Sequence, residues 1–503
     1  MSTDTERPFD RNRRGFDPGS AYRLSQQVAL REEPFGALAY HYGNRRLTFL
    51  RSPSLVDLVR GLDGEETVED AISASPMGER KKSAVCALSS LENSEILEKV
   101  SPLESPGAIR AAATKRRAED RRSTQPPAPT RRLTEEMKQG LDAPICLTWE
   151  LTYGCNLACV HCLSSSGRRD PRELSTKQAM HFIDELSSMK VFYVNVGGGE
   201  PTIRSDFFDI VSYCVGRGVG VKFSTNGGTM TAERAHRLAS MDYVDVQISI
   251  DGATPATNDP VRGEGSFAAA RRAMCLLSDA GFDSLKISAV VTRLNVPEID
   301  DLLALAGQFG AELRLTRLRP AGRGVQTWHE LHPTLNQQRT LHDWLKDHPE
   351  VLTGDSFFHL SAFGEALPGL NLCGAGRIVC LIDPIGDVYA CPFVMHPEFK
   401  AGSVLGEGGF SEIWRNSDLF DGLRHPSTGG ACNACGAFDS CQGGCMAAKF
   451  FTGLPLDGPD PECALGHGES ALAVLGPGRR PEPGPGHSKK VAATVPVVLG
   501  RAR

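Results

Sequence analysis

Between residues 146 and 320 the sequence alternates short apolar runs with longer amphipathic runs. The apolar runs span 146–152, 193–199, 221–227, 244–252, 286–293 and 312–320, with the length and composition of strands. Amphipathic runs such as 175–189, which Ser175 can cap, lie between them. This alternation predicts an α/β fold in which parallel strands form an open barrel or a wide sheet. In such folds the working residues lie at the C-terminal ends of the strands.

A smaller unit is predicted for residues 21–100. Three short strands at 27–33, 36–42 and 45–50 precede three helical runs, and Gly43 with Asn44 supplies a hairpin turn between the last two strands. Ser52 can cap the first helix, and Thr67 with Asp70 forms a capping pair for the second. A unit of about 80 residues can fold alone. It contains no catalytic constellation, so we expect it to bind a partner.

The remaining segments and the charge balance complete the expected organisation. Residues 1–20 and 468–503 are expected to be disordered, and residues 101–131 have the composition of a linker. The barrel is assigned to 132–345 and a cysteine-dense domain to 346–467. A net charge of −6 argues against nucleic acid as a partner, and no apolar run is long enough to span a membrane. The start lacks the apolar core of a signal peptide, so a cytoplasmic protein is expected.

A loop directly after the first barrel strand contains Cys155, Cys159 and Cys162 in the pattern C-x3-C-x2-C. A four-iron cluster normally has four protein ligands, so a loop with three thiolates leaves one iron open to a small molecule. Such a cluster can do chemistry as well as carry electrons. His161 lies inside the loop and could be an additional ligand. The alternative is a structural zinc loop, although zinc sites usually pair their cysteines differently.

Most of the other cysteines lie in the last third of the chain. Eight thiolates there are enough for two fully ligated four-iron clusters, or alternatively for two zinc ribbons. They are Cys373, Cys380, Cys391, Cys432, Cys435, Cys441, Cys445 and Cys463. The remaining four are isolated and are expected to be small core residues: Cys86, Cys146, Cys214 and Cys275.

Polar residues follow three of the predicted strands, where they would lie at the same end of the barrel as the cysteine loop. The second strand ends in a glycine run that allows close backbone approach, followed by a carboxylate that can bind an ammonium group. The next two strands end in hydroxyl, amide and carboxylate groups, and a guanidinium follows. In order these residues are Gly197, Gly198, Gly199, Glu200, Ser224, Thr225, Asn226, Ser249, Asp251 and Arg262. Each could be an ordinary cap or turn, but their order after the cysteine loop favours a binding site.

Together these features resemble the radical S-adenosylmethionine (SAM) superfamily, which implies a partial (β/α)6 barrel. In that family the open iron binds SAM, which yields a 5′-deoxyadenosyl radical. The resemblance implies that Glu200 holds the SAM ammonium group, beside Gly198, Gly199 and Asn226. Ser249 and Arg262 are expected near the ribose and carboxylate, and Asp251 is expected among the SAM-binding residues. His161 stands where the family often has an aromatic residue and is expected near the adenine.

The C-terminal cysteines resemble the SPASM extension of peptide-modifying members, with interleaved ligand sets. The resemblance implies that Cys373, Cys380, Cys391 and Cys445 hold a first auxiliary cluster, and that Cys432, Cys435, Cys441 and Cys463 hold a second. That makes three [4Fe-4S] clusters in all. Residues 133–467 are similar to the mycofactocin maturases. Residues 21–100 resemble a PqqD-like, winged-helix-like chaperone that binds leader peptides, here fused to the enzyme.

The resemblance implies a substrate and a reaction. The substrate is a ribosomal precursor peptide ending in Val-Tyr, whose leader the N-terminal unit binds. The enzyme removes CO2 oxidatively from the tyrosine and then joins the decarboxylated tyrosine to the valine. Electrons come from a donor such as ferredoxin or flavodoxin. Arg317, Arg319 and Arg323 are candidates to meet the peptide carboxylate, or alternatively form ion pairs or SAM contacts. The competing interpretations are a thioether-forming or sulfatase-type maturase, and a non-catalytic electron-transfer protein that binds peptide.

Overall fold

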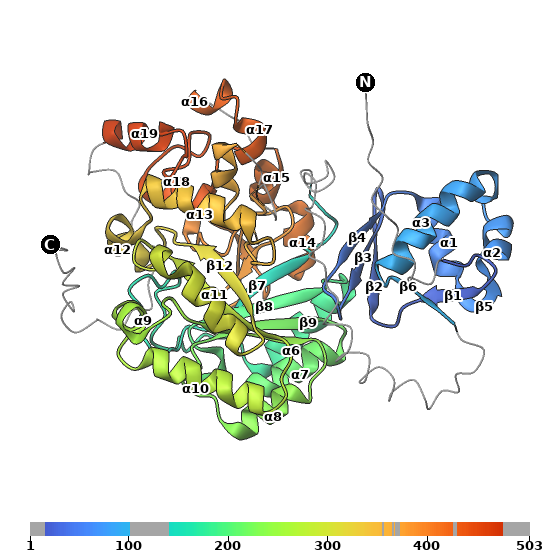
Figure 1. Ribbon diagram of the computed structural model, residues 1–503, viewed down its shortest axis with the longest axis horizontal. Helices are drawn as coiled ribbons and strands as arrows, with labels where there is room; N and C mark the ends of the chain where they lie inside the picture. Colours follow the sequence, from blue (N-terminus) through green and yellow to red (C-terminus); the bar gives the residue numbers. More distant parts are fainter. Residues whose placement is uncertain are drawn as a thin grey trace. The chain divides into compact units, whose positions relative to one another are not determined.

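The computed structural model describes residues 16–100, 140–354, 357–364, 367, 373–425 and 430–475. The chain forms two compact units, residues 1–124 and 125–503 (Figure 1). The segments expected to be disordered or to form the linker lie largely outside the described residues. Two short pieces of the expected ends are ordered: residues 17–20 form a turn closed by a hydrogen bond from Ser20 N to Asp17 O, and helix α19 runs to Leu475.

The first unit contains the expected three-stranded antiparallel sheet. Its order is β2-β3-β4, with β2 at Val28–Glu33, β3 at Gly36–His41 and β4 at Leu47–Leu50. Helices α1 (Pro53–Gly61), α2 (Val68–Ala74) and α3 (Lys81–Asn93) follow as predicted. The Ser52 hydroxyl accepts a hydrogen bond from Leu55 N at 3.4 Å, and the Thr67 hydroxyl accepts one from Asp70 N at 3.2 Å. Both predicted helix caps are confirmed.

A second sheet in this unit was not predicted. It has the order β5-β1-β6, formed by Ala21–Leu24 (β1), Asp63–Thr67 (β5) and Leu97–Lys99 (β6). The β5 strand reads DGEET and is largely exposed, so it lacks the apolar alternation that marks a strand in sequence. Its pairing with β1, rather than its own composition, makes it a strand.

The second unit begins with the six predicted barrel strands. These are β7 (Cys146–Thr152), β8 (Tyr193–Gly198), β9 (Gly220–Thr225), β10 (Val244–Ser249), β11 (Leu285–Val291) and β12 (Glu312–Arg317). The intervening helices are α6 (Thr176–Ser188), α7 (Phe207–Gly216), α8 (Ala232–Ala239), α9 (Pro255–Arg262), α10 (Ser266–Asp279) and α11 (Ile299–Gln308). Helices α12 (Gly324–Leu331) and α13 (Leu335–Asp347) follow the last strand. Ser175 caps α6 in a reciprocal capping box with Gln178.

The barrel sheet continues into the cysteine-dense region. Its full order is β12-β11-β10-β9-β8-β7-β13-β14-β15, with β13 at Leu381–Ile382, β14 at Asp387–Tyr389 and β15 at Lys400–Ser403. The β13 strand pairs in parallel with β7, and β14 and β15 continue antiparallel. The remaining helices, orange and red in Figure 1, are α14 (Gly409–Asn416), α15 (Asp418–Arg424), α16 (Gly430–Asn433), α17 (Phe438–Cys441), α18 (Met446–Thr452) and α19 (His467–Leu475).

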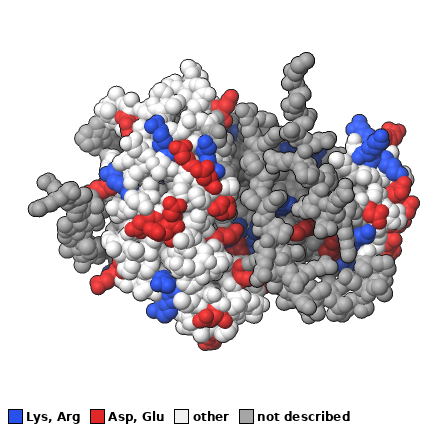
Figure 2. Space-filling model, in the orientation of Figure 1, with Lys and Arg blue, Asp and Glu red and all other residues white. Residues whose placement is uncertain are grey.

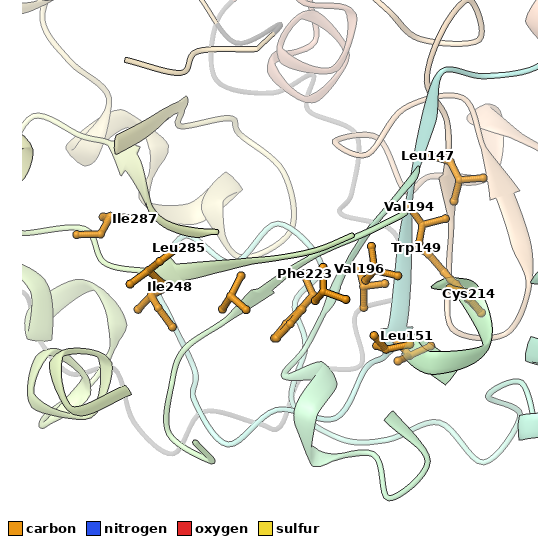
Figure 3. Close-up of a cluster of buried hydrophobic side chains, with 14 of the residues drawn as sticks. Leu147, Trp149, Leu151, Val194, Val196, Cys214, Phe223, Ile248, Leu285 and Ile287 are labelled. Atoms are coloured by element: carbon orange, nitrogen blue, oxygen red, sulfur yellow. The ribbon is translucent and has the colours of Figure 1, made fainter. Parts of the chain in front are cut away.

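One face of the barrel strands supplies the apolar core, part of which Figure 3 shows. On β7, Leu147, Trp149 and Leu151 are at most 1% exposed, and Trp149 meets Phe182 of α6 edge-to-face at 5.2 Å between ring centroids. Because side chains alternate across a strand, Thr148 and Glu150 lie on the opposite, inner face. The barrel therefore has an apolar outside beneath its helices and a polar inside.

One face of the described surface is mixed in charge. On the face shown in Figure 2, acidic and basic side chains are interspersed. Among the described residues, no helix is long and apolar enough to cross a membrane.

Cys146 and Cys214 are buried as expected, but Cys86 and Cys275 are exposed, so the prediction that all four isolated cysteines are core residues was wrong for those two. Both lie on helices, where one face remains in solvent.

Candidate functional site

The three-cysteine loop follows β7 and is held by backbone hydrogen bonds at its base. Cys155 N donates to Gly167 O at 3.1 Å, and Gly167 N donates to Tyr153 O at 2.8 Å. A segment after β12 closes the loop from the other side: a Cβ at Gly322 would stand only 2.2 Å from Leu163 O. Gly322 has a φ of +55°, so both its conformation and its contact require glycine there.

Arg323 fixes the same loop through its backbone and side chain. Its N–H donates to Cys162 O at 2.9 Å, its Nε to Cys159 O at 2.8 Å and its Nη1 to Ser166 O at 2.8 Å. The guanidinium is therefore engaged with the loop backbone. Arg323 therefore positions the cysteine loop, and its Nε and Nη1 would have to leave Cys159 O and Ser166 O to meet a peptide carboxylate.

The three thiols are half-buried and belong to one donor set. Burial is the main cause that raises the pKa of Cys155 to about 11, and the thiols of Cys159 and Cys162 and the Glu200 carboxylate act in the same direction. Burial likewise raises the pKa of Cys159. Thiols so placed are neutral unless a positive centre stabilises the thiolates, which is the condition that iron ligation supplies. The chemistry of this donor set fits the expected cluster.

The cysteine loop can be compared with a site for a single metal ion. Within the described part of the chain, no three His, Cys, Asp or Glu side chains come close enough together to hold one metal ion. An iron–sulfur cubane is larger than one ion because sulfides lie between its irons, so its ligands stand farther apart.

The glycine-rich end of β8 packs directly on the cysteine loop. A Cβ at Gly199 would lie 1.9 Å from Gly154 O, and Glu200 N donates to that same oxygen at 2.8 Å. The Glu200 carboxylate, 1% exposed, accepts from the Thr225 hydroxyl at 2.7 Å and from Asn226 N at 2.8 Å. Burial raises the pKa of Glu200, and these hydrogen bonds oppose that rise. The predicted carboxylate is thus buried and oriented beside the loop.

Asn226 connects the third barrel strand to the cysteine loop. Its Nδ2 donates to Asn156 Oδ1 at 2.8 Å, and its Oδ1 accepts from Gly228 N at 2.8 Å. The sequence prediction included Asn226 but missed Asn156, which follows the first cysteine. Its position next to Cys155 was the available signal.

Asp251 is the centre of a buried charged group at the end of β10. Its Oδ2 lies 2.5 Å from His161 Nε2 and 2.7 Å from Arg262 Nε, and its Oδ1 accepts from Val290 N at 2.7 Å. Arg262 and His161 hold the pKa of Asp251 well below its usual range despite burial. His161 therefore ties the cysteine loop to β10. Ser249, the last residue of β10, is half-buried and in register with Ser288.

Four of the eight C-terminal cysteines meet in one cavity, which encloses about 370 Å³, part of it open to solvent. The thiols lining it are Cys432, Cys435, Cys441 and Cys463. Burial raises the pKa of Cys441 to about 11, and the other three thiols add to the rise. Asp460 and His359 also line the cavity. This is the set expected for the second auxiliary cluster, and the structure brings it together.

The first auxiliary set is divided. Cys391 and Cys445 are buried in one apolar cluster, with Cys373 packed against it, whereas Cys380 belongs to the main core of the barrel. Arg319 reaches the first group: its Nε lies 3.4 Å from Cys445 Sγ. The structure thus places three of the expected ligands together and the fourth elsewhere.

Arg317 is occupied by a carboxylate pair near the C-terminal cysteines. Its Nη2 lies 2.5 Å from Asp460 Oδ1, and its Nε donates to Glu462 Oε2 at 2.5 Å. Asp460 also accepts from Cys445 N at 2.6 Å. Of the three candidate arginines, Arg317 is therefore a structural ion pair. The acidic pair just before Cys463 was the signal that the sequence prediction did not use.

Glu150 is a buried inner-face carboxyl that the sequence analysis did not select. It is 2% exposed, and no group in the described structure hydrogen-bonds its Oε2. Burial, and secondarily repulsion from Asp383, raises the pKa of Glu150 to about 8. Burial is also the main cause that raises the pKa of Asp383 to about 6, while Tyr153 donates to it at 2.8 Å. Glu150 therefore holds a proton at neutral pH when the chain is folded.

This proton makes stability depend on pH. Because the folded-state pKa of Glu150 is raised above 4.5, its favourable contribution is complete below pH 4.5 and is lost as pH rises to about 8. We expect the melting temperature to fall across that window, and Glu150→Gln to remove up to about 5 kcal/mol of the dependence. Differential scanning fluorimetry from pH 5 to 9 measures this, with exposed Glu330→Gln as control. Equal slopes in all three proteins would contradict the assignment.

Comparisons with known proteins agree with this geometry. Residues 149–306 match the radical SAM superfamily, residues 373–436 an iron–sulfur cluster-binding domain, and residues 21–125 the peptide chaperone MftB family. The chain is 61% identical over 375 residues to the mycofactocin maturase MftC of Mycobacterium tuberculosis, covering 74% of this chain and 96% of that protein. It is 65% identical to MftC of Mycolicibacterium smegmatis, covering 68% and 88%.

A solved structure shares the fold. The crystal structure of Streptococcus suis SuiB bound to S-adenosylmethionine superposes with a TM-score of 0.63 at 18% identity, covering 88% of this chain and 99% of SuiB. The alignment covers nearly the whole length of the M. tuberculosis maturase but only 74% of this chain, which also contains a chaperone-family region at residues 21–125. The chain thus belongs to the mycofactocin maturase family of peptide-modifying radical SAM enzymes, with a chaperone-family domain on the same polypeptide.

Proposed function

We propose that this chain, working in the cytoplasm, modifies the C-terminal Val-Tyr of a ribosomal precursor peptide. It removes CO2 oxidatively from the tyrosine and then forms a C–C bond to the valine, as steps in making mycofactocin. One observation carries the proposal: the cysteine loop and the Glu200 turn are one hydrogen-bonded unit, in a chain 61–65% identical to mycofactocin maturases. The cofactors are SAM and three [4Fe-4S] clusters, with a ferredoxin or flavodoxin as electron donor.

The chain's own residues bind and orient these groups. When bound, the clusters and SAM supply the electron and the 5′-deoxyadenosyl radical that takes a hydrogen atom from tyrosine Cβ, and a sink for the electron released with CO2. Cys155, Cys159 and Cys162 hold three corners of the first cluster. Glu200 binds the SAM ammonium group through Oε2: Oε1 already accepts from Thr202 and Thr225, whereas Oε2 accepts one hydrogen bond in the described structure, from Asn226 N, and a carboxylate oxygen has about two acceptor positions. Thr225 and Asn226 fix its orientation.

Arg262 and Asp251 have complementary roles beside the loop. Both are buried, and their ion pair at 2.7 Å keeps the guanidinium charged at the end of the barrel. Cys159 Sγ lies 3.7 Å from Arg262 O, so this element touches the cysteine loop directly. We assign Arg262 and Ser249 to the SAM carboxylate and ribose, with Gly198 and Gly199 giving the backbone room to approach. His161 acts by holding Asp251 and the loop together.

The first unit is assigned to leader binding. In the sheet β2-β3-β4 the central strand β3 is buried along its whole length, and β2 and β4 are the outer strands. An extended peptide adds to such a sheet through main-chain hydrogen bonds. Fusion makes delivery intramolecular, with an effective concentration on the order of mM for a flexible linker. A separate chaperone is therefore unnecessary.

The test is an anaerobic assay with the reconstituted full chain, SAM, a reductant and a synthetic peptide ending in Val-Tyr. Mass spectrometry is expected to show loss of one CO2 and two hydrogen atoms, followed by a cyclised product. The matched control is the same peptide without its final tyrosine, which is expected to stay unchanged. A thioether product, or SAM cleavage with no change in either peptide, would refute the reaction. A large stimulation by added free chaperone would refute the self-sufficiency.

A further inference from the structure

The first auxiliary site is assembled by a tight turn and three thiols. Gly376 N donates to Ala390 O at 3.1 Å, so the turn after Cys373 lies against the residue before Cys391. Cys391 and Cys445 are 6% and 4% exposed and share one apolar cluster, against which Cys373 packs. The Cys373 and Cys445 thiols both raise the pKa of Cys391, after burial. These three thiols form one donor set.

Cys380 lies in a different environment. It directly precedes β13, and its carbonyl accepts a hydrogen bond from Thr148 N of β7 at 3.0 Å, so the sheet fixes its position. Alternation along β13 puts Cys380 on the same face as Ile382, and both belong to the core beneath the barrel helices, at 0% exposure. Burial is the main cause that raises the pKa of Cys380, and the thiol that adds to this rise is Cys146, not Cys373, Cys391 or Cys445. The strand pairing directs Cys380 into the core.

Arg319 supplies an independent sign of a missing ligand at the three-thiol site. Its guanidinium stacks 3.5 Å from the centre of the Phe393 ring, and its Nε lies 3.4 Å from Cys445 Sγ. The side chain is buried, at 5% exposure, yet no group in the described structure accepts a hydrogen bond from its Nη1. A buried cationic donor without an acceptor is costly, which indicates that an anionic acceptor belongs there.

We propose that the first auxiliary cluster is held by Cys373, Cys391 and Cys445 alone, and that its fourth iron binds a carboxylate-bearing ligand, oriented by Arg319. Cys380 is then a core residue. Arginine suits this role because its planar fork matches a carboxylate. The inference rests on the proposed function only in assuming that the chain holds auxiliary clusters. It does not depend on which peptide is modified.

The first test is an iron count with Cys155, Cys159 and Cys162 all replaced by Ala, so that only auxiliary clusters remain. In that background we expect about eight irons per chain, and Cys380→Ala should keep them, whereas Cys391→Ala should lose about four. Cys214→Ala, another fully buried thiol of the same core, controls for packing. Loss of one cluster in Cys380→Ala, with Cys214→Ala intact, would overturn the proposal. Peptide turnover is not part of this readout, so failure of the proposed reaction would not affect it.

The second test leaves Cys380 in place and therefore does not depend on how its variants fold. Isotope-labelled cyanide, an anion that binds an open iron, is added to the reduced protein lacking the loop cysteines. We expect nuclear hyperfine coupling in the auxiliary-cluster EPR signal, and competition by formate, the simplest carboxylate. Arg319→Gln should weaken formate competition about tenfold or more, since it removes a charged hydrogen-bond donor. Absence of cyanide coupling would overturn the assignment of an open iron. Formate competition that is unchanged in Arg319→Gln would overturn the role of Arg319.

Discussion

Replacing Cys155, Cys159 and Cys162 together by Ala is expected to abolish reductive cleavage of SAM to 5′-deoxyadenosine. These thiols are the proposed cluster ligands in the loop after β7, and without them we expect no cluster to be held beside Glu200. Because the chemistry depends on an electron reaching SAM through that iron, activity should fall to the level of buffer alone. Chromatographic quantification of 5′-deoxyadenosine under anaerobic conditions measures the effect.

Two controls separate loss of chemistry from loss of fold. Cys275→Ala replaces an exposed thiol of α10 and should leave both SAM cleavage and iron content unchanged. The triple variant itself should retain the iron and the EPR signals of the C-terminal clusters, which use other cysteines. SAM cleavage retained by the triple variant would mean that the radical arises elsewhere, and the site assignment would be wrong.

Arg317→Ala is expected to cause the largest loss of stability among single substitutions considered for this chain. It leaves Asp460 and Glu462, which are 3% and 6% exposed, buried without their cationic partner. Breaking a buried ion pair on one side costs about 3–5 kcal/mol, because the remaining charge is not solvated. Asp460 also lines the second auxiliary cavity and accepts from Cys445 N, so iron in both auxiliary sites should fall.

The measurement combines a melting curve with iron analysis. Arg415→Ala, at an exposed position of α14, is the matched control and should change neither quantity appreciably. Arg317→Lys keeps the charge but not the fork, so it should fall between the wild type and Arg317→Ala. If Arg317→Ala melted and bound iron like the wild type, the network would not stabilise the auxiliary sites.

The sequence predicted the elements whose pattern is local. All six barrel strands and the caps at Ser52, Thr67 and Ser175 lie where periodicity and capping residues indicated. The cysteine loop, Glu200 and Asn226 meet as expected because they all follow parallel strands, whose C-terminal ends share one edge. In such folds, predicting a strand also predicts where the residue that follows it lies.

What could not be predicted depends on partners distant in sequence. β5 is a strand because β1 pairs with it, and Cys380 is a core residue because β13 lies beside β7. Arg317 finds its carboxylates more than 140 positions later. Glu150 looked like an ordinary strand residue, and only the folded barrel shows that its Oε2 is buried without a hydrogen-bond partner among the described residues. In each case tertiary pairing, rather than local composition, decides the role.

The continuous sheet has a consequence for electron flow. The strand β7 leads into the cysteine loop at its end and pairs along its side with β13, from which the chain proceeds to Cys391. Main-chain hydrogen bonds, rather than a flexible tether, therefore set the separation of the proposed radical-generating cluster from the proposed first auxiliary cluster. Since tunnelling rates fall steeply with distance, transfer between them should proceed at one fixed rate whether or not a leader peptide is docked.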